Sequence, residues 1–373
     1  MKSNFVPVNE PLLDGNELAY LSECVKSGWI SSEGPFVTRF ESEFAAYVGR
    51  AHGIAVANGS VALDLAFAAL ELEPGSEVIL PTFTIISCAA AIVRAGLRPV
   101  VVDCHPETWN MTAEAIEARI TARTRAILVV HIYGLPVDMD PVLALAAKHG
   151  LAIVEDAAEM HGQTYNGRRC GSFGAISTFS FYPNKLVTTG EGGMVVTDDS
   201  ALAERCRLLR NLAFVPARRF VHEELGWNYR LTNLQAALGV AQLERIDTFL
   251  RIKRAIGVRY NEGLRDVAGI TVAPERTAFA ENLYWVYGIV LDDDVPFDAA
   301  RAMERLASMG VGCRPFFWCM HEQPVFRKMG LFDGERHPFA ERLARRGFYI
   351  PSGLALTGEQ QAIVIDKVRE LMQ

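Results

Sequence analysis

Apolar runs that alternate with helix-favouring runs are the feature that most constrains the fold of this chain. Between Gly53 and Asp156, short apolar segments are separated by segments with helical periodicity. The expected strands are 53–57, 77–80, 99–103, 126–130 and 152–156, and the expected helices are 62–72, 85–94, 113–119 and 139–149. Helices between buried strands require right-handed crossovers, so this order predicts an α/β fold with a largely parallel sheet.

The C-terminal part of the chain has a different pattern. A long helical stretch at 231–260 is followed by expected strands at 284–291 and 311–315 and by expected helices at 298–308 and 356–371. A chain of 373 residues is too long for one small core. We therefore expect a large α/β domain over residues 1–245 and a small α+β domain over residues 246–373.

Composition excludes several classes of protein. Half of the residues are hydrophobic and 22% are charged, which argues against disorder, and the net charge of -7 disfavours nucleic-acid or membrane partners. No apolar run reaches the length of a membrane span, and residues 1–8 lack the apolar core of a signal peptide. The seven cysteines form no CxxC pair, so we expect reduced thiols, a cytoplasmic protein and no metal site.

Lys185 and Asp156 are the candidate chemical groups. Asp156 ends an expected strand, and ligands of open α/β sheets gather at the carboxyl ends of the strands. Lys185 follows Ser180 in the run Ser180-Phe181-Tyr182-Pro183-Asn184-Lys185. Alone, such a lysine is usually a surface charge and such an acid is usually a cap. Together they indicate a site for pyridoxal 5'-phosphate (PLP), which needs an amine for a Schiff base, a carboxylate at its ring nitrogen and small polar groups at its phosphate.

Two glycine-containing segments add to this interpretation. Asn58-Gly59-Ser60 precedes an expected helix, where backbone N–H groups suit a phosphate, although the same residues also form an ordinary N-cap. Gly190-Glu191-Gly192-Gly193 lets the backbone pass close to a ligand, although it also reads as a turn. No GxGxxG motif follows a strand, so a dehydrogenase with a bound dinucleotide has little support.

Taken in order, these motifs resemble the DegT/DnrJ/EryC1/StrS family of sugar aminotransferases. The resemblance runs from about Leu13 to the C-terminus. Its segments are 58–60, 81–84, 131–134, 155–159, 180–185, 189–193 and 226–233. It implies the aspartate-aminotransferase fold (PLP fold type I), with a large, mostly parallel, seven-stranded sheet domain and a small α+β domain. It also implies a homodimer with shared active sites.

The resemblance assigns roles to individual residues. Lys185 matches the lysine that holds PLP and moves a proton, and Asp156 matches the acid that keeps the ring nitrogen protonated. Further cofactor contacts are expected from Gly59, Ser60, Ile85, Ala158, Glu159, Ser180 and, across the dimer, Asn233. Ile85 stands where the family often has a stacking aromatic residue. Phe83 is a possible substitute, although its spacing favours the core.

The resemblance also suggests substrate contacts and a reaction. The candidate substrate-binding residues are Trp29, His131, Arg218, Arg219, Arg230, Phe317 and His321. For the arginine pair, the alternative is a solvated surface; for Phe317 and the histidines, it is a structural role. Transfer would run from L-glutamate, through pyridoxamine 5'-phosphate, to a nucleotide-linked keto-deoxysugar.

The segments 29–32 and 188–190 and the pair Arg218-Arg219 are most similar to members that aminate C4 of GDP-4-keto-6-deoxymannose, a step towards O-antigen lipopolysaccharide. A UDP- or dTDP-linked acceptor aminated at C3 or C4 remains an alternative, as does a non-catalytic PLP-binding regulatory protein. A lysine at position 185, where the family's dehydratases carry histidine, indicates transamination.

Overall fold

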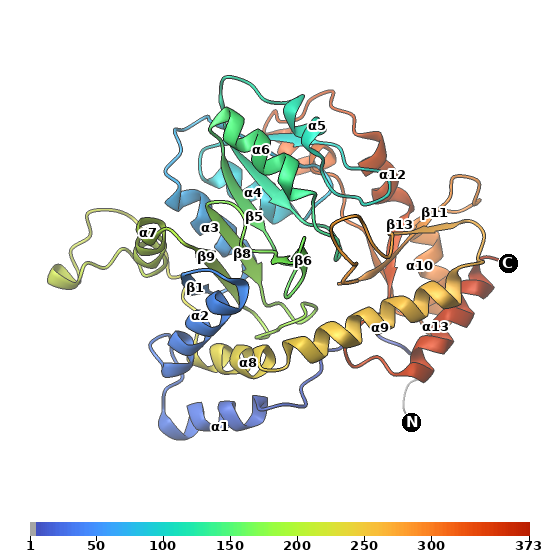
Figure 1. The fold of residues 1–373 in the computed structure, drawn as a ribbon, viewed down its shortest axis with the longest axis horizontal. Coiled ribbons are helices and arrows are strands. Elements are labelled where there is room, and N and C mark those ends of the chain that lie inside the picture. Colours follow the sequence, from blue (N-terminus) through green and yellow to red (C-terminus); the bar gives the residue numbers. More distant parts are fainter. Residues whose placement is uncertain (1–4) are drawn as a thin grey trace.

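The computed structural model describes residues 5–373, so residues 1–4 of the expected large domain lie outside the described part. Its centre is a seven-stranded sheet that Figure 1 shows between helices. In spatial order the strands are β1 (His52–Val56), β9 (Gly193–Thr197), β8 (Ile176–Ser180), β5 (Ala152–Asp156), β4 (Thr124–Val130), β2 (Glu77–Pro81) and β3 (Arg98–Val102). Strands β8, β5, β4, β2 and β3 run parallel, and β9 is antiparallel to β1 and β8. The predicted largely parallel sheet is confirmed.

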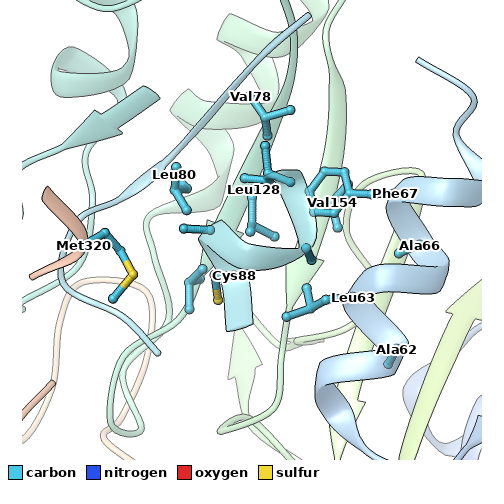
Figure 2. Packing of buried hydrophobic residues seen from close by; sticks show 14 of the residues in the cluster. Ala62, Leu63, Ala66, Phe67, Val78, Leu80, Cys88, Leu128, Val154 and Met320 are labelled. Atoms are coloured by element: carbon cyan, nitrogen blue, oxygen red, sulfur yellow. The ribbon is translucent and has the colours of Figure 1, made fainter. Parts of the chain in front are cut away.

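Alternate residues of each strand pack into two separate hydrophobic cores, one on each face of the sheet. The helices of this part are α1 (Glu17–Ser27), α2 (Pro35–Val48), α3 (Gly59–Ala69), α4 (Ile86–Arg94), α5 (Ala113–Glu117), α6 (Met139–His149) and α7 (Ser200–Arg210). Figure 2 shows the core under α3 and α4, where Phe67 meets Leu128 and Val154. Leu128 is fully buried, so truncation to alanine would cost about 2–5 kcal/mol of stability.

The helical stretch that we expected at 231–260 is two helices. The first, α8 (Asn233–Leu243), begins at a capping box between Thr232 and Gln235, and the second is α9 (Ile246–Leu264). Both α8 and the start of α9 pack in the core of the large sheet, where Val240 and Phe249 lie, and the end of α9 contributes Tyr260 to the core of the small sheet. In Figure 1, α9 runs from α8 to the C-terminal elements. The boundary at residue 245 stays a prediction.

The C-terminal part is built on an antiparallel sheet. Its strands, in order, are β10 (Ile270–Val272), β11 (Tyr287–Leu291), β13 (Gly347–Ile350) and β12 (Arg314–Pro315). Its helices are α10 (Ala299–Ser308), α11 (Pro324–Lys328), α12 (Pro338–Arg346) and α13 (Gly358–Leu371). The strand expected at 311–315 is shortened because Val311 pairs with Val6 instead. The start of the chain therefore packs beside this small sheet.

Smaller elements complete the chain. A hairpin of β6 (Thr164–Tyr165) and β7 (Arg168–Arg169) follows β5, and short 3-10 turns lie at Pro216–Arg218 and Met320–Glu322. All seven cysteines are free thiols. Among the helices of residues 5–373, none combines the length and the apolar character that a bilayer span requires.

Candidate active site

A cavity of about 680 Å³ lies at the carboxyl ends of β4, β5 and β8. Parallel α/β sheets place their ligands at this edge, because the connecting loops and the helix N-termini converge there. The structure brings many of the predicted residues together in its wall: Gly59, Ser60, Ile85, His131, Asp156, Ala158, Glu159, Ser180, Lys185 and Phe317.

Lys185 points its amine into this cavity from the turn after β8. Its N–H donates to the carbonyl of Tyr182 at 2.9 Å, which closes the turn. The Nζ atom lies 3.7 Å from Glu159 Oε1 and 3.9 Å from the centre of the Trp285 ring. Burial lowers the pKa of the Lys185 amine, although the charges of Glu159 and Asp156 oppose this change. A lowered pKa favours the neutral amine that a nucleophilic lysine needs.

Asp156 is the last residue of β5 and is buried. Its Oδ1 accepts a hydrogen bond from Ala158 N at 3.1 Å, and its Oδ2 accepts one from Cys88 Sγ at 3.3 Å. Burial raises the pKa of the Asp156 carboxyl, while the two donors lower it. Because carboxylate oxygens can accept further bonds, this acid can receive a cationic N–H from a bound ligand.

Glu159 links the amine to the opposite wall. Its Oε2 accepts a hydrogen bond from Tyr133 N at 2.8 Å, while its Oε1 faces Lys185. Burial raises the pKa of Glu159 to about 7, against the lowering effect of the Lys185 charge. The carboxylate and the ammonium therefore stabilise each other's charge against the cost of burial.

The opposite end of the cavity is the N-terminus of α3. Asn58 caps the helix, since its side chain accepts from Val61 N at 3.0 Å. Ser60 Oγ lies 2.7 Å from Ser87 Oγ. A Cβ atom on Gly59 would lie 2.6 Å from Ser180 Cβ, so only glycine lets the helix start approach the end of β8. The result is a helix N-terminus with hydroxyl groups around it, an arrangement suited to phosphate.

Ile85 and Phe83 take different places. The Ile85 side chain is exposed and lines the cavity, so it is available to a flat ligand. The ring of Phe83 is fully buried and packs against Tyr133 and Phe316. Phe83 is therefore a core residue, as its spacing favoured, and cannot replace a stacking aromatic residue.

The two predicted histidines are both held by structural hydrogen bonds. His131 lines the cavity, but its ring is fixed between Glu155 Oε1 at 3.0 Å and Val137 N at 3.0 Å. His321 is buried between Thr82 Oγ1 at 2.7 Å and Glu341 Oε1 at 3.2 Å and is not part of the cavity wall. Both of its ring nitrogens are engaged within this chain, and its substrate contact stays a prediction.

Asn233 is engaged within its own chain. Its side chain is 1% exposed. Its Oδ1 accepts from Phe36 N at 2.8 Å, and its Nδ2 donates to Trp29 O at 2.7 Å and to Cys24 Sγ at 3.2 Å. The contact of Asn233 with a phosphate in a second subunit stays a prediction. Asn233 fixes the start of α8 against α1 and α2.

The remaining predicted substrate residues lie outside the cavity wall of this chain: Trp29, Arg218, Arg219 and Arg230. Arg218 pairs with Glu223 at 2.5 Å on the surface, and the Arg219 guanidinium lies 5.3 Å from the centre of the Phe214 ring. Arg230 donates to Asn211 Oδ1 at 2.7 Å.

Sequence reasoning missed two aromatic residues of the wall. Trp285 and Tyr349 reach the cavity from the C-terminal part. Within an apolar, strand-like run such residues resemble ordinary core. Their distance along the chain from Lys185 gives no local signal that they meet it.

Comparison with known proteins agrees with this geometry. The chain matches the DegT/DnrJ/EryC1/StrS aminotransferase family over residues 11–369, and it belongs to that family. It is 41% identical to GDP-perosamine synthase of Caulobacter vibrioides over 94% of each chain. It is 38% identical to GDP-perosamine synthase of Escherichia coli O157:H7 over 98% of each chain.

Solved structures define the fold class. The aminotransferase TlmJ from Streptoalloteichus hindustanus superimposes with a TM-score of 0.91 at 31% identity, covering 98% of both chains. DesV of S. venezuelae, solved in complex with a ketimine intermediate, gives 0.88 at 35% identity, covering 96% of this chain and 94% of that chain. The expected aspartate-aminotransferase fold is confirmed, and the chain is an aminotransferase.

Proposed function

We propose that this chain is a PLP-dependent aminotransferase that moves an amino group from L-glutamate to GDP-4-keto-6-deoxymannose and so makes GDP-perosamine. The observation that carries the reaction is the placement of Lys185 and Asp156 in the wall of one cavity. The acceptor is supported by relatives named GDP-perosamine synthase in three bacteria, at 38–41% identity over 94–98% of this chain.

The residues present fit PLP. An amine, an acid and a helix N-terminus with hydroxyl groups are the donor set that this cofactor needs. The Gly59 contact with Ser180 leaves the phosphate end free of side-chain bulk. In the described part of the chain, Thr178 Oγ1 is buried in the cavity wall without a hydrogen-bond partner, as expected of a group awaiting a ligand. The cavity volume lies in the range of about 300–1,000 Å³ that small-molecule and cofactor sites occupy.

In this proposal each residue has one task. When bound, PLP supplies an electron sink for the carbon that loses its proton. Lys185 Nζ holds the cofactor covalently at rest, and its freed, neutral amine accepts the proton from the donor carbon. Asp156 keeps the ring nitrogen protonated. Gly59 N–H and the hydroxyls of Ser60 and Ser180 hold the phosphate.

The proposal includes a homodimer. Several large apolar side chains are exposed on α1, just after it, and on segment 214–227, among them Leu18, Trp29, Phe220 and Leu225. Patches of this kind mark interaction surfaces. A shared active site would also give Arg218, Arg219 and Arg230 a route to the diphosphate of the acceptor in the partner's cavity. We also propose that the protein acts in O-antigen synthesis and lies in the cytoplasm. The free thiols support the cytoplasmic location.

The test is a panel of acceptors. The enzyme is loaded with pyridoxamine 5'-phosphate and mixed with GDP-, UDP- or dTDP-linked ketosugars, and the products are identified by mass spectrometry. We expect the GDP-linked 4-keto-6-deoxymannose to be consumed fastest, with the amine at C4. Turnover with only UDP- or dTDP-linked sugars would correct the acceptor, and turnover with none would remove the sugar assignment.

A regulatory function without catalysis is the second candidate, because one relative, at 34% identity over 97% of this chain, is named a pleiotropic regulatory protein in Geobacillus stearothermophilus. Glutamate separates the two. An aminotransferase converts its PLP absorption to that of pyridoxamine 5'-phosphate when glutamate is added, whereas a PLP-binding regulator keeps its spectrum unchanged.

A further inference from the structure

Trp285 makes two contacts with consecutive residues at the reacting amine. The face of its indole ring lies over Lys185 Nζ, which is 3.9 Å from the ring centre. Its Nε1–H donates to the carbonyl of Asn184 at 2.9 Å. Trp285 is 4% exposed and comes from the C-terminal part of the chain, whereas Lys185 belongs to the turn after β8. One side chain therefore holds both the lysine head and the backbone just before it.

Trp285 is itself held from behind. Lys253, a buried residue of α9, donates from Nζ to the carbonyl of Trp285 at 2.8 Å and to the carbonyl of Ser352. The buried ring of Tyr133 lies 5.9 Å from the Trp285 ring. Trp285 therefore has one hydrogen bond on its indole N–H and another on its backbone carbonyl. It cannot shift without breaking one of them.

We propose that Trp285 is a positioning residue for Lys185, holding the amine in the cavity by its ring face and the turn of Asn184 by its N–H. The catalytic consequence rests on the proposed function. Once a substrate amine has displaced Lys185 from the cofactor, the freed side chain has four rotatable bonds and no covalent anchor. The Trp285 face keeps the amine within reach, and it stabilises the ammonium that forms when Nζ takes the proton from the donor carbon.

This contact predicts a measurable property of Lys185 that does not require turnover. A ring face favours the ammonium over the amine, so removing it lowers the pKa of Lys185. The titratable groups facing Lys185 are Glu159, Asp156, Cys88 and His161, and none of them changes in the variants below. Leucine removes the aromatic face, whereas phenylalanine keeps a weaker one.

The first experiment measures that pKa on the full chain freed of cofactor. Acetic anhydride acetylates lysines in proportion to their neutral fraction, and mass spectrometry reads the Lys185 peptide against the surface residues Lys148 and Lys367 over a pH series. We expect the pKa of Lys185 to fall in the order wild type, Trp285→Phe, Trp285→Leu, by about one pKa unit in the last. An unchanged or raised pKa in both variants overturns the proposal.

A matched control removes a similar contact elsewhere. Phe297 lies with its ring 4.6 Å from the Arg305 guanidinium, away from the cavity wall. Phe297→Leu should leave the pKa of Lys185 unchanged. Circular dichroism checks that each variant folds. The Trp285→Phe variant alone decides the result if Trp285→Leu does not fold.

The second experiment separates this proposal from the proposed function. With glutamate, Trp285→Phe should lower kcat several-fold and change KM for glutamate by less than about twofold, because the donor is bound by other groups. A several-fold rise in KM for glutamate with an unchanged kcat would contradict a positioning role. If the wild type shows no transamination but Lys185 labelling responds to Trp285, the proposed function fails and the contact stands.

Discussion

Two regions expected to take part in transamination differ sharply in how they are built. The reaction end, defined as Gly59, Asp156, Glu159, Ser180 and Lys185, consists of residues that line one cavity. The exposed segment, residues 214–227, carries Arg218 and Arg219. Figure 1 shows this part of the chain, after α7, projecting from the body of the molecule. Phe220 and Leu225 there are 81% and 90% exposed.

The difference separates chemistry from recognition. The groups of the reaction end are placed by neighbouring strands and one helix N-terminus of the same chain. The exposed segment has large apolar side chains in the open and an arginine whose carboxylate partner is equally exposed. An exposed apolar surface of this kind marks a site of contact with another molecule. The account therefore predicts large effects on both half-reactions at the reaction end and small, substrate-specific effects at the exposed segment.

Loss of the amine should have the largest effect. Lys185→Ala removes both the covalent anchor and the proton acceptor, so pyridoxamine 5'-phosphate formation from glutamate should fall by at least about 10⁴-fold. Stopped-flow absorbance measures it. Lys148→Ala, which removes a surface lysine paired with Glu117, is the control and should react normally. Substantial turnover by Lys185→Ala would show that the reaction does not need this amine.

Loss of the acid's charge should come next. Asp156→Asn keeps the shape and, through its amide oxygen, the hydrogen bond from Ala158 N, but its Nδ2 cannot accept from Cys88 Sγ and the negative charge is lost. We expect PLP to remain bound and both half-reactions to slow by about 10²- to 10³-fold. Single-turnover kinetics with glutamate and with the ketosugar measure this. Near-normal rates in either direction would remove Asp156 from the mechanism.

Behind the reaction end, Lys253 should make stability depend on pH. Burial lowers the pKa of Lys253 to about 7, below its value in an unfolded chain, so between these two values the unfolded state binds more protons. The stability contributed by this position is therefore lowest below pH 7 and rises with pH. Relative to Lys253→Met, the wild-type free energy of unfolding should rise by about 1.4 kcal/mol per pH unit between roughly pH 7 and 10. Urea titrations at pH 7 and pH 9 measure this difference, and a constant difference would contradict the account.

The exposed segment should show the smallest effects. Arg218 is paired with Glu223 on the surface, and such pairs contribute only about 0–1 kcal/mol to stability. Arg218→Ala and Arg219→Ala should leave the glutamate half-reaction within about twofold of wild type. They should raise KM for the nucleotide sugar by up to about tenfold, the cost of one weakened charge contact. Steady-state kinetics, with glutamate and the nucleotide sugar varied in turn, measure both effects. An impaired glutamate reaction would show that this segment belongs to the reaction end.

The sequence predicted the regular elements well where periodicity was strong. The helix 139–149 and the strand 152–156 occur with the expected bounds, because both combine clear patterning with turn residues at their ends. The break between α8 and α9 was missed because both halves are strongly helical. Apolar residues of α8 and of the first turns of α9 lie in one core, so the apolar pattern of the sequence carries no signal at the break.

The candidate site shows the same limit. Lys185 and Asp156 could be found because their residue types and order follow from the chemistry of a cofactor. The burial of the Asn233 amide could not be predicted, since a polar residue beside the helix cap Thr232 looks available in sequence. Trp285 was missed because its meeting with Lys185 depends on how two distant parts of the chain pack.

The most direct test of the central claim is to find which amine carries the cofactor. The full chain is reconstituted with PLP and reduced with sodium borohydride, and its peptides are mapped by mass spectrometry. The account predicts the phosphopyridoxyl group on Lys185, and its loss when glutamate is added before reduction. A group distributed over surface lysines, or none on Lys185, would contradict it.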